Sequence, residues 1–171
     1  LTSTLEDIYK SFQQKKNLIE HIHHTALNEF KKDENISLAH LKSRVLSHFD
    51  LQYIDLDFYI INKDYVIIDA TFKKDIGLDF KMIPDAKKEL DKASKDDEIH
   101  LGENVAIDYI GSTIKIYSIS KINNNTYLEM AFIDPSIYNT LRSRIENISK
   151  STGNKMNLFR VRKTSSSEEY Y

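Results

Sequence analysis

Residues 54–72 have the sequence IDLDFYIINKDYVIIDATF, in which apolar and polar side chains alternate up to a short polar break. Successive side chains of a β-strand point to opposite faces, so the first half has an apolar face and a mixed face: Ile54, Leu56, Phe58 and Ile60 against Asp55, Asp57 and Tyr59. Residues 62–64 form the break, and β-branched residues are frequent after it. The stretch therefore predicts a β-hairpin.

Three more strands are predicted beyond this hairpin. A loop containing Gly77 leads into a helix at 84–93, with Pro84 in the first turn, where a missing N–H costs nothing. Strands follow at about 99–110, with a weak point at Gly102, at 113–122 and at 126–133. Short connections at 111–112 and 123–125 make neighbouring strands antiparallel, which gives a five-stranded antiparallel sheet.

Helices are predicted on both sides of this region. Residues 1–30 place apolar side chains three and four positions apart, the period of a coiled-coil seam, with Lys15 as an interruption. Ser37 is a suitable N-cap for a second helix, and Asp134 with Pro135 is a suitable start for a helix that ends near Gly153. The first helix could pack on its own domain or form a stalk that dimerises. We expect the stalk, and therefore a homodimer formed through this helix.

The order of elements predicts an α+β fold, a five-stranded antiparallel sheet with a long N-terminal helix and a C-terminal helix. Three parts are expected: N-terminal helices at 1–50, a core with the sheet and the helix that follows it at 51–150, and a final part at 151–171. Residues 157–162 in this last part fit one more strand, at the start of a truncated second module, or a tail. Because the chain begins at Leu1, we expect it to be a piece of a longer protein.

Composition excludes several kinds of site. The chain of 171 residues has no cysteine, which rules out disulfides, thiolate nucleophiles and cysteine zinc sites. Its four glycines stand apart, so it has no glycine-rich phosphate loop. The net charge is −2, whereas a protein that binds nucleic acid is expected to have a strongly basic surface, so a nucleic-acid partner is not predicted. No apolar run reaches the roughly 18 residues that a membrane-spanning helix needs. We predict no cofactor.

Two segments resemble the Cache family of extracytoplasmic sensor domains, whose sheet is PAS-like. The first is FYIINKDYVIIDAT at 58–71, closed by IGLDF at 76–80, and the second is IKIYSIS at 114–120, followed by YLEMAFID at 127–134. The element order agrees with the family over roughly residues 1–150. Two departures stand out: Lys63 and Asp64 occupy a turn where many members have glycine, and the chain has no tryptophan, which one branch of the family uses to bind amino acids.

The resemblance implies a non-catalytic domain that senses a small molecule outside the cytoplasm, in the periplasm. Its parent would be a bacterial transmembrane receptor of the histidine kinase, chemotaxis receptor or diguanylate cyclase type, with membrane spans outside this piece. Two alternatives stay open. One is a cytoplasmic PAS-like module that binds protein partners without a ligand, and the other is a metal-dependent enzyme.

Polar side chains on strands with two covered faces are the candidate ligand contacts, since a buried polar group without a partner costs about 1–3 kcal/mol. They are Tyr59, Asp69, Thr71, Tyr109, Lys115 and Tyr117. Lys81 is a further candidate, because it lies just past the loop with Gly77, which would form the rim of the pocket. Asp134 is expected to cap its helix, and the resemblance implies that it can also face the ligand. The sequence does not specify the ligand.

One string of residues, Glu20 to His24, has the side chains of a metal site. On a helix, His21 and His24 share a face, as do Glu20 and His24. The same pattern fits a solvated helix side, with Ile22 facing the sheet. Because a metal ion wants three or four ligands, these residues are weak candidates, and we predict no metal site.

Overall fold

The computed structural model describes residues 2–51, 53–102, 106–108, 113–153, 161–163 and 168–170. Helices and strands follow in the order α1 (Thr2–Lys32), α2 (Leu38–Phe49), β1 (Asp55–Asn62), β2 (Ile67–Ala70), α3 (Pro84–Ala93), β3 (His100–Leu101), β4 (Ala106–Asp108), β5 (Thr113–Asn123), β6 (Thr126–Ile133), α4 (Pro135–Thr152), β7 (Val161–Lys163) and β8 (Glu168–Tyr170). Two 3₁₀ turns, η1 (Lys73–Asp75) and η2 (Phe80–Met82), lie between β2 and α3. The predicted helices and strands of residues 1–153 are confirmed at nearly the predicted bounds, apart from the strand at 99–110.

The main sheet is antiparallel, with the strand order β2-β1-β6-β5 and with β3 and β4 both paired to the outer edge of β5. The strand predicted at 99–110 is thus two short strands, separated after Leu101 near the weak point at Gly102. Counted as one position, they give five positions in the PAS-like order 2-1-5-4-3. The α+β prediction with a five-stranded antiparallel sheet is therefore confirmed.

The β1–β2 turn has the tight geometry that the polar break predicts. The Asn62 carboxamide oxygen accepts hydrogen bonds from the backbone N–H groups of Asp64 and Val66, both at 3.0 Å. Tyr65 then takes a left-handed conformation, with φ of 64°. From this position its hydroxyl donates to Asp91 on α3, with an O–O distance of 3.0 Å. The turn therefore helps to hold α3 over the sheet.

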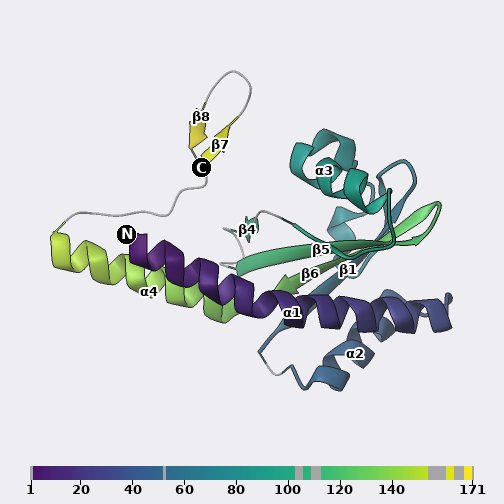
Figure 1. Ribbon diagram of the computed structural model, residues 1–171, viewed down its shortest axis with the longest axis horizontal. Helices are drawn as coiled ribbons and strands as arrows, with labels where there is room; N and C mark the ends of the chain where they lie inside the picture. Colours follow the sequence, from purple (N-terminus) through teal and green to yellow (C-terminus); the bar gives the residue numbers. More distant parts are fainter. Residues whose placement is uncertain are drawn as a thin grey trace.

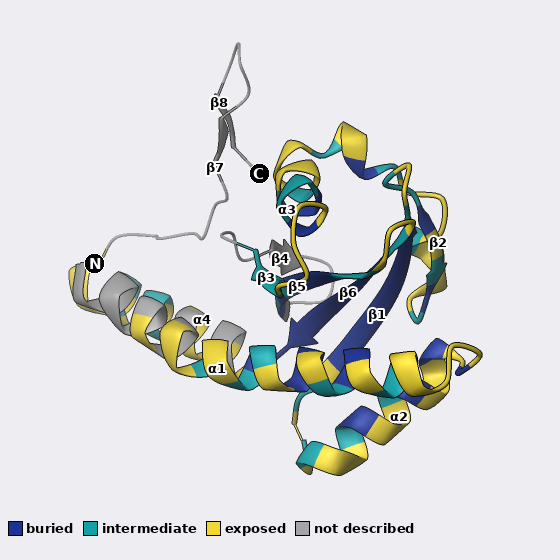
Figure 2. Cartoon of the chain, turned by 45° about the vertical axis from the view of Figure 1, so that its right-hand side comes forward, coloured by how far each residue is buried: buried dark blue, intermediate teal, exposed yellow. Residues whose placement is uncertain are grey.

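Helices α1 and α2 cover one face of the sheet, which we call the closed face. Ile19, Ile22 and Ala26 of α1 and Leu41 of α2 are fully buried there, against strand residues such as Leu56, Phe58, Leu128, Met130 and Phe132. In Figure 2, β1 and β6 are buried along almost their whole length. The second half of the α1 seam is thus occupied by the domain's own core.

Helix α3 and the loop around η1 and η2 cover the opposite face, which we call the cavity face. Its smaller core joins Leu90 and Ala93 of α3 to strand residues Tyr59, Ile61, Ile67 and Ile119. Figure 1 shows α3 on one side of the sheet and α1 with α2 on the other. The sheet is therefore the middle layer of the molecule.

Helices α1 and α4 lie side by side and extend together beyond the sheet (Figure 1). Lys15, the residue that interrupts the apolar seam, forms a salt bridge with Asp134. Asp134 is also the N-cap of α4, accepting from the Ser136 backbone N–H at 2.8 Å, as predicted. The interruption in the seam thus marks the place where α1 leaves the sheet and meets α4.

Beyond α4, the short strands β7 and β8 pair with each other, away from the main sheet. The strand expected at 157–162 overlaps β7, although its first residues lie outside the described part of the chain. Among the helices in the described residues, none is long and apolar enough to cross a membrane.

Candidate functional site

A cavity of about 290 Å³ lies between α3 and the sheet, and we call it the α3 cavity. Its apolar wall combines strand, loop and helix residues: Ile67, Leu78, Phe80, Ile83, Ala86 and Ile119. Its polar side chains include Tyr59, Tyr117 and Glu129 from the sheet, and Asp75, Asp85, Lys88, Glu89 and His100 around them. An apolar hollow with a few converging polar groups is typical of a small-molecule site.

One row of residues across the sheet lies under this cavity. Glu129 of β6 is paired with Tyr59 of β1 on one side and with Ile119 of β5 on the other. Ile119 is paired in turn with His100 of β3. Paired residues of antiparallel strands point to the same face, so these side chains lie next to one another on the cavity face.

Glu129 is the buried acidic group of the site. The residue is 7% exposed, and its Oε2 atom has no hydrogen-bond partner within the described part of the chain. Burial raises the pKa of this carboxyl to about 8, and the charge of Asp75 acts in the same direction. At neutral pH, the carboxyl therefore keeps its proton most of the time.

Tyr59 is the second buried polar group without a partner. Its ring is 1% exposed, and its hydroxyl makes no hydrogen bond to any described residue. Burial raises the pKa of this hydroxyl, and nearby Tyr117 and Asp57 add to the effect. Two such groups side by side each cost about 1–3 kcal/mol unless something in the cavity bonds to them.

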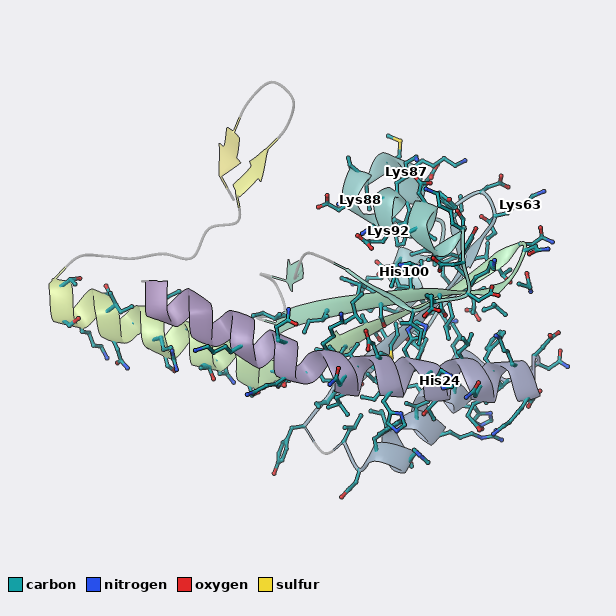
Figure 3. The ribbon with its side chains drawn as sticks, viewed as in Figure 1. His24, Lys63, Lys87, Lys88, Lys92 and His100 are labelled. Atoms are coloured by element: carbon teal, nitrogen blue, oxygen red, sulfur yellow. The ribbon has the colours of Figure 1, made fainter. Side chains whose placement is uncertain are left out.

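The charged groups around the cavity come mainly from α3. Glu89 forms a salt bridge with Lys92, with an N–O distance of 3.1 Å, and the His100 ring nitrogen lies 2.7 Å from an oxygen of Asp96. Figure 3 shows Lys88 and Lys92 on α3 and His100 between α3 and the sheet. It also shows His24 on α1, across the sheet from the cavity.

Of the predicted ligand contacts, the structure brings Tyr59 and Tyr117 into the α3 cavity. Thr71 and Lys115 lie instead around Asp57, on the same face but outside the cavity lining. Thr71 donates to the Asp57 carboxylate at 2.9 Å and accepts from the Phe58 backbone N–H at 3.0 Å. Lys115 Nζ lies 3.6 Å from the other Asp57 oxygen. These polar groups have partners within the protein.

The remaining candidates lie apart from the cavity. Asp69 is partly exposed and bonds to Lys73 Nζ at 2.7 Å, and Lys81 is exposed. Asp134 is buried at the start of α4, where burial would raise its pKa but hydrogen bonds from Lys15 and Ser136 lower it below its usual value. Tyr109 lies outside the described residues.

The string at Glu20–His24 does not form a metal site of three ligands. His21 stacks edge-on against Phe49, with ring centroids 5.2 Å apart, and His24 pairs with Asn28 at 3.0 Å. Glu20 lies 3.8 Å from Lys16 Nζ. The described residues contain no group of three or more histidine, aspartate or glutamate side chains that could hold a metal ion.

Two important residues, Glu129 and His23, were not among the predicted ones. Glu129 carries a visible signal, because it is the one charged residue in the strand TYLEMAFI, whose neighbours are apolar on both faces. His23 of α1 is fully buried on the closed face, where its ring nitrogens lie 2.7 Å and 2.8 Å from the hydroxyls of Ser118 and Ser120. Burial and the charge of His24 lower the pKa of His23 to about 3, so the ring is neutral.

No protein-family model and no curated protein sequence matches this chain. A solved structure of an extracellular ligand binding receptor from Desulfohalobium retbaense DSM5692 is similar, with a TM-score of 0.44 and 12% sequence identity. The similarity covers 77% of this chain and 26% of that one, so this chain spans about a quarter of the receptor's length.

Proposed function

We propose that this chain is a sensor domain that binds a small molecule in the α3 cavity. The observation that carries the proposal is a pair of buried polar atoms, Tyr59 Oη and Glu129 Oε2, which belong to two paired residues of the cavity lining and have no hydrogen-bond partner among the described residues. A bound molecule that bonds to both atoms removes their desolvation cost. The proposal assigns the domain no catalytic step.

The proposed signal passes through β5 to α1. Ile119 lies on the cavity face, whereas its two neighbours, Ser118 and Ser120, hold the imidazole of His23 on the closed face. A shift of β5 on ligand binding would therefore move the contacts of α1. A ligand biases such a two-state element only by binding one state more tightly than the other.

We further propose that the domain is extracytoplasmic and of the Cache type, in a bacterial transmembrane receptor, and that it forms a homodimer through α1. The sequence resemblance and the PAS-like sheet support this assignment. The arrangement of α1 and α4 also supports it, because both helices extend beyond the sheet side by side, so that a change at the sheet can reach elements outside it.

A thermal-shift screen tests the binding function, with amino acids, dicarboxylates, short fatty acids and polyamines as probes. A molecule that binds only the folded state stabilises it by about 2.7 kcal/mol at a hundred times its dissociation constant. The variant Ala86→Trp fills the cavity from α3, and Ala86→Phe is a smaller substitute if the first does not fold. Ala39→Trp, at an exposed position of α2, is the matched control.

We expect at least one class of probe to raise the melting temperature of the wild type and of Ala39→Trp, but not of the cavity-filled variant. A shift that persists in Ala86→Trp, or flat melting curves across the whole panel, would overturn the proposed function. Circular dichroism of each variant checks that its secondary structure is unchanged.

A further inference from the structure

We propose that the ligand of the α3 cavity carries a protonated amine on a small apolar body, and that this amine binds between Glu129 and Tyr59. The inference rests on the proposed function and names the chemical class of its ligand. It follows from the charges of the cavity, from the geometry of its two partnerless atoms and from the character of its walls.

The charges of the cavity are mostly negative. Besides Glu129, which holds its proton at neutral pH, the lining contains three carboxylates: Asp75 of η1, and Asp85 and Glu89 of α3, of which Glu89 is paired with Lys92. In the described lining, Lys88 is the single lysine or arginine, and the His100 ring is bonded to the carboxylate of Asp96. Such a cavity attracts a cation and disfavours an anion.

The hydrogen-bonding groups of the cavity floor suit an ammonium group. Glu129 Oε2 is a buried acceptor, and the hydroxyl of Tyr59 on the neighbouring strand accepts as well as donates. An ammonium group carries three N–H donors and no acceptor, so its donors match two oxygen acceptors on paired residues. A charge-assisted bond to a carboxylate is also roughly twice as strong as a bond between neutral groups.

The walls suit an apolar body of modest size. Phe80, Ile83 and Ile119 form apolar surfaces, and the rings of Tyr59 and Tyr117 add aromatic ones that favour a nearby cation. A volume of about 290 Å³ lies at the lower end of the range for ligand cavities. The cavity therefore fits a small molecule with an apolar body rather than a long one.

Binding of the amine has a measurable proton balance. The buried carboxyl of Glu129 holds its proton at neutral pH in the free protein, and an ammonium group beside it favours the carboxylate. The ligand enters as R–NH3⁺, Glu129 becomes ionised, and its proton goes to the buffer. Other ionisable side chains also line the cavity: Asp75, Asp85, Glu89, Lys88 and His100. The variant Glu129→Gln therefore separates the proton released by Glu129 from any that these groups release.

Isothermal titration calorimetry at neutral pH tests the inference with three probes of nearly equal size: benzylamine, benzyl alcohol and benzoate. Each titration is run in two buffers of different ionisation enthalpy, which reports the protons released. We expect benzylamine to bind about tenfold or more tightly than the other two, with release of most of one proton. Glu129→Gln should lower benzylamine affinity about tenfold or more and abolish this release, whereas Glu146→Gln on α4 should change neither.

The amine inference is overturned if benzoate or benzyl alcohol binds as tightly as benzylamine, if none of the three binds, or if Glu129→Gln leaves benzylamine affinity unchanged. These failures are separable from failure of the binding function. Binding of an uncharged or anionic probe that is lost in Ala86→Trp leaves the cavity as a ligand site and removes only the amine. A panel that yields no ligand removes both.

Discussion

The two faces of the sheet treat buried polar groups in opposite ways. On the closed face, His23 is fully buried and each of its ring nitrogens is bonded to a serine hydroxyl of β5. On the cavity face, Tyr59 and Glu129 are almost as deeply buried, yet Tyr59 Oη and Glu129 Oε2 have no partner among the described residues. The buried imidazole of the closed face thus has its partners within the fold, whereas two buried polar atoms of the cavity face have none among the described residues.

Strand β5 contributes side chains to both faces of the sheet. Residues 118–120 of β5 alternate between the faces, so that two serines hold α1 while the isoleucine between them lies under the α3 cavity. The closed face has the larger apolar core, and the cavity face has the smaller core and the two polar atoms without a partner among the described residues.

The largest effect is expected for His23→Ala. The change removes a buried ring and leaves two buried serine hydroxyls without their partner, which should lower the free energy of unfolding by about 3–5 kcal/mol. Chemical denaturation measures this value. Substitution of His24, which is exposed on the same helix, is the control and should change stability by less than about 0.5 kcal/mol. A loss below about 1 kcal/mol for His23→Ala would contradict a structural role for the imidazole.

The pH dependence of the unfolding free energy is a second test of the role of His23. The pKa of His23 is lowered from 6.5 to about 3 in the fold, so the neutral ring is favoured and its full contribution is present above pH 6.5. As the pH falls below 6.5 towards 3, the unfolded chain binds a proton that the fold rejects, and stability is lost. From pH 6.5 to about 4 the loss is about 3 kcal/mol.

Comparison with His23→Gln isolates this contribution, because glutamine does not titrate. The difference in unfolding free energy between wild type and variant should shrink as the solution becomes acidic. A difference that stays constant between pH 6.5 and about 4 would mean that the buried imidazole takes up protons freely.

Glu129→Gln should raise the free energy of unfolding, whereas the changes at His23 should lower it. The pKa of Glu129 is raised from 4.5 to about 8, so its contribution is fully present below pH 4.5 and is lost as the pH rises through 8. Glutamine has no such cost, and the variant should be more stable than wild type by about 2–3 kcal/mol at neutral pH without ligand. The gain should vanish near pH 4.5.

The matched control is Glu146→Gln, at an exposed position of α4 that pairs with Arg142. It should change stability by less than about 0.5 kcal/mol at every pH. A Glu129→Gln variant that is less stable than wild type at neutral pH would show that the carboxyl is satisfied within the fold, and the contrast between the two faces would be lost.

The smallest effect on stability is expected for Tyr59→Phe. Removal of a hydroxyl without a partner should leave the free energy of unfolding within about 0.5 kcal/mol of wild type, or slightly higher. The same variant should weaken ligand binding if the hydroxyl bonds to the ligand. A destabilisation above about 1.5 kcal/mol would instead indicate a hydrogen-bond partner for this hydroxyl inside the protein.

Much of the fold could be predicted from local patterns. The alternation at 54–60, the polar turn at 62–64 and the Asp134-Pro135 helix start depend on neighbours in the sequence, and the structure confirms them. Lys15 was visible as an interruption of the seam. Its partner, Asp134, lies 119 positions away, so no local pattern could identify the salt bridge.

The site was harder to predict, because burial depends on which elements cover each face. Tyr59 and Tyr117 were found as polar residues on covered strands, and they line the cavity. Thr71 and Lys115 satisfied the same rule, but they are bonded to Asp57, a partner that the strand pattern does not reveal. Glu129 could have been found as the charged residue in an otherwise apolar strand, whereas His23 looked like its exposed neighbours.

A high-resolution crystal structure of the protein at neutral pH, with benzylamine added, tests the central claim most directly. We predict an open cavity between α3 and the sheet, with the amine nitrogen within hydrogen-bond distance of both Glu129 Oε2 and Tyr59 Oη. The account would be contradicted by a structure in which α3 packs directly onto the sheet, with no space for a ligand, and in which the Tyr59 hydroxyl donates a hydrogen bond to Glu129.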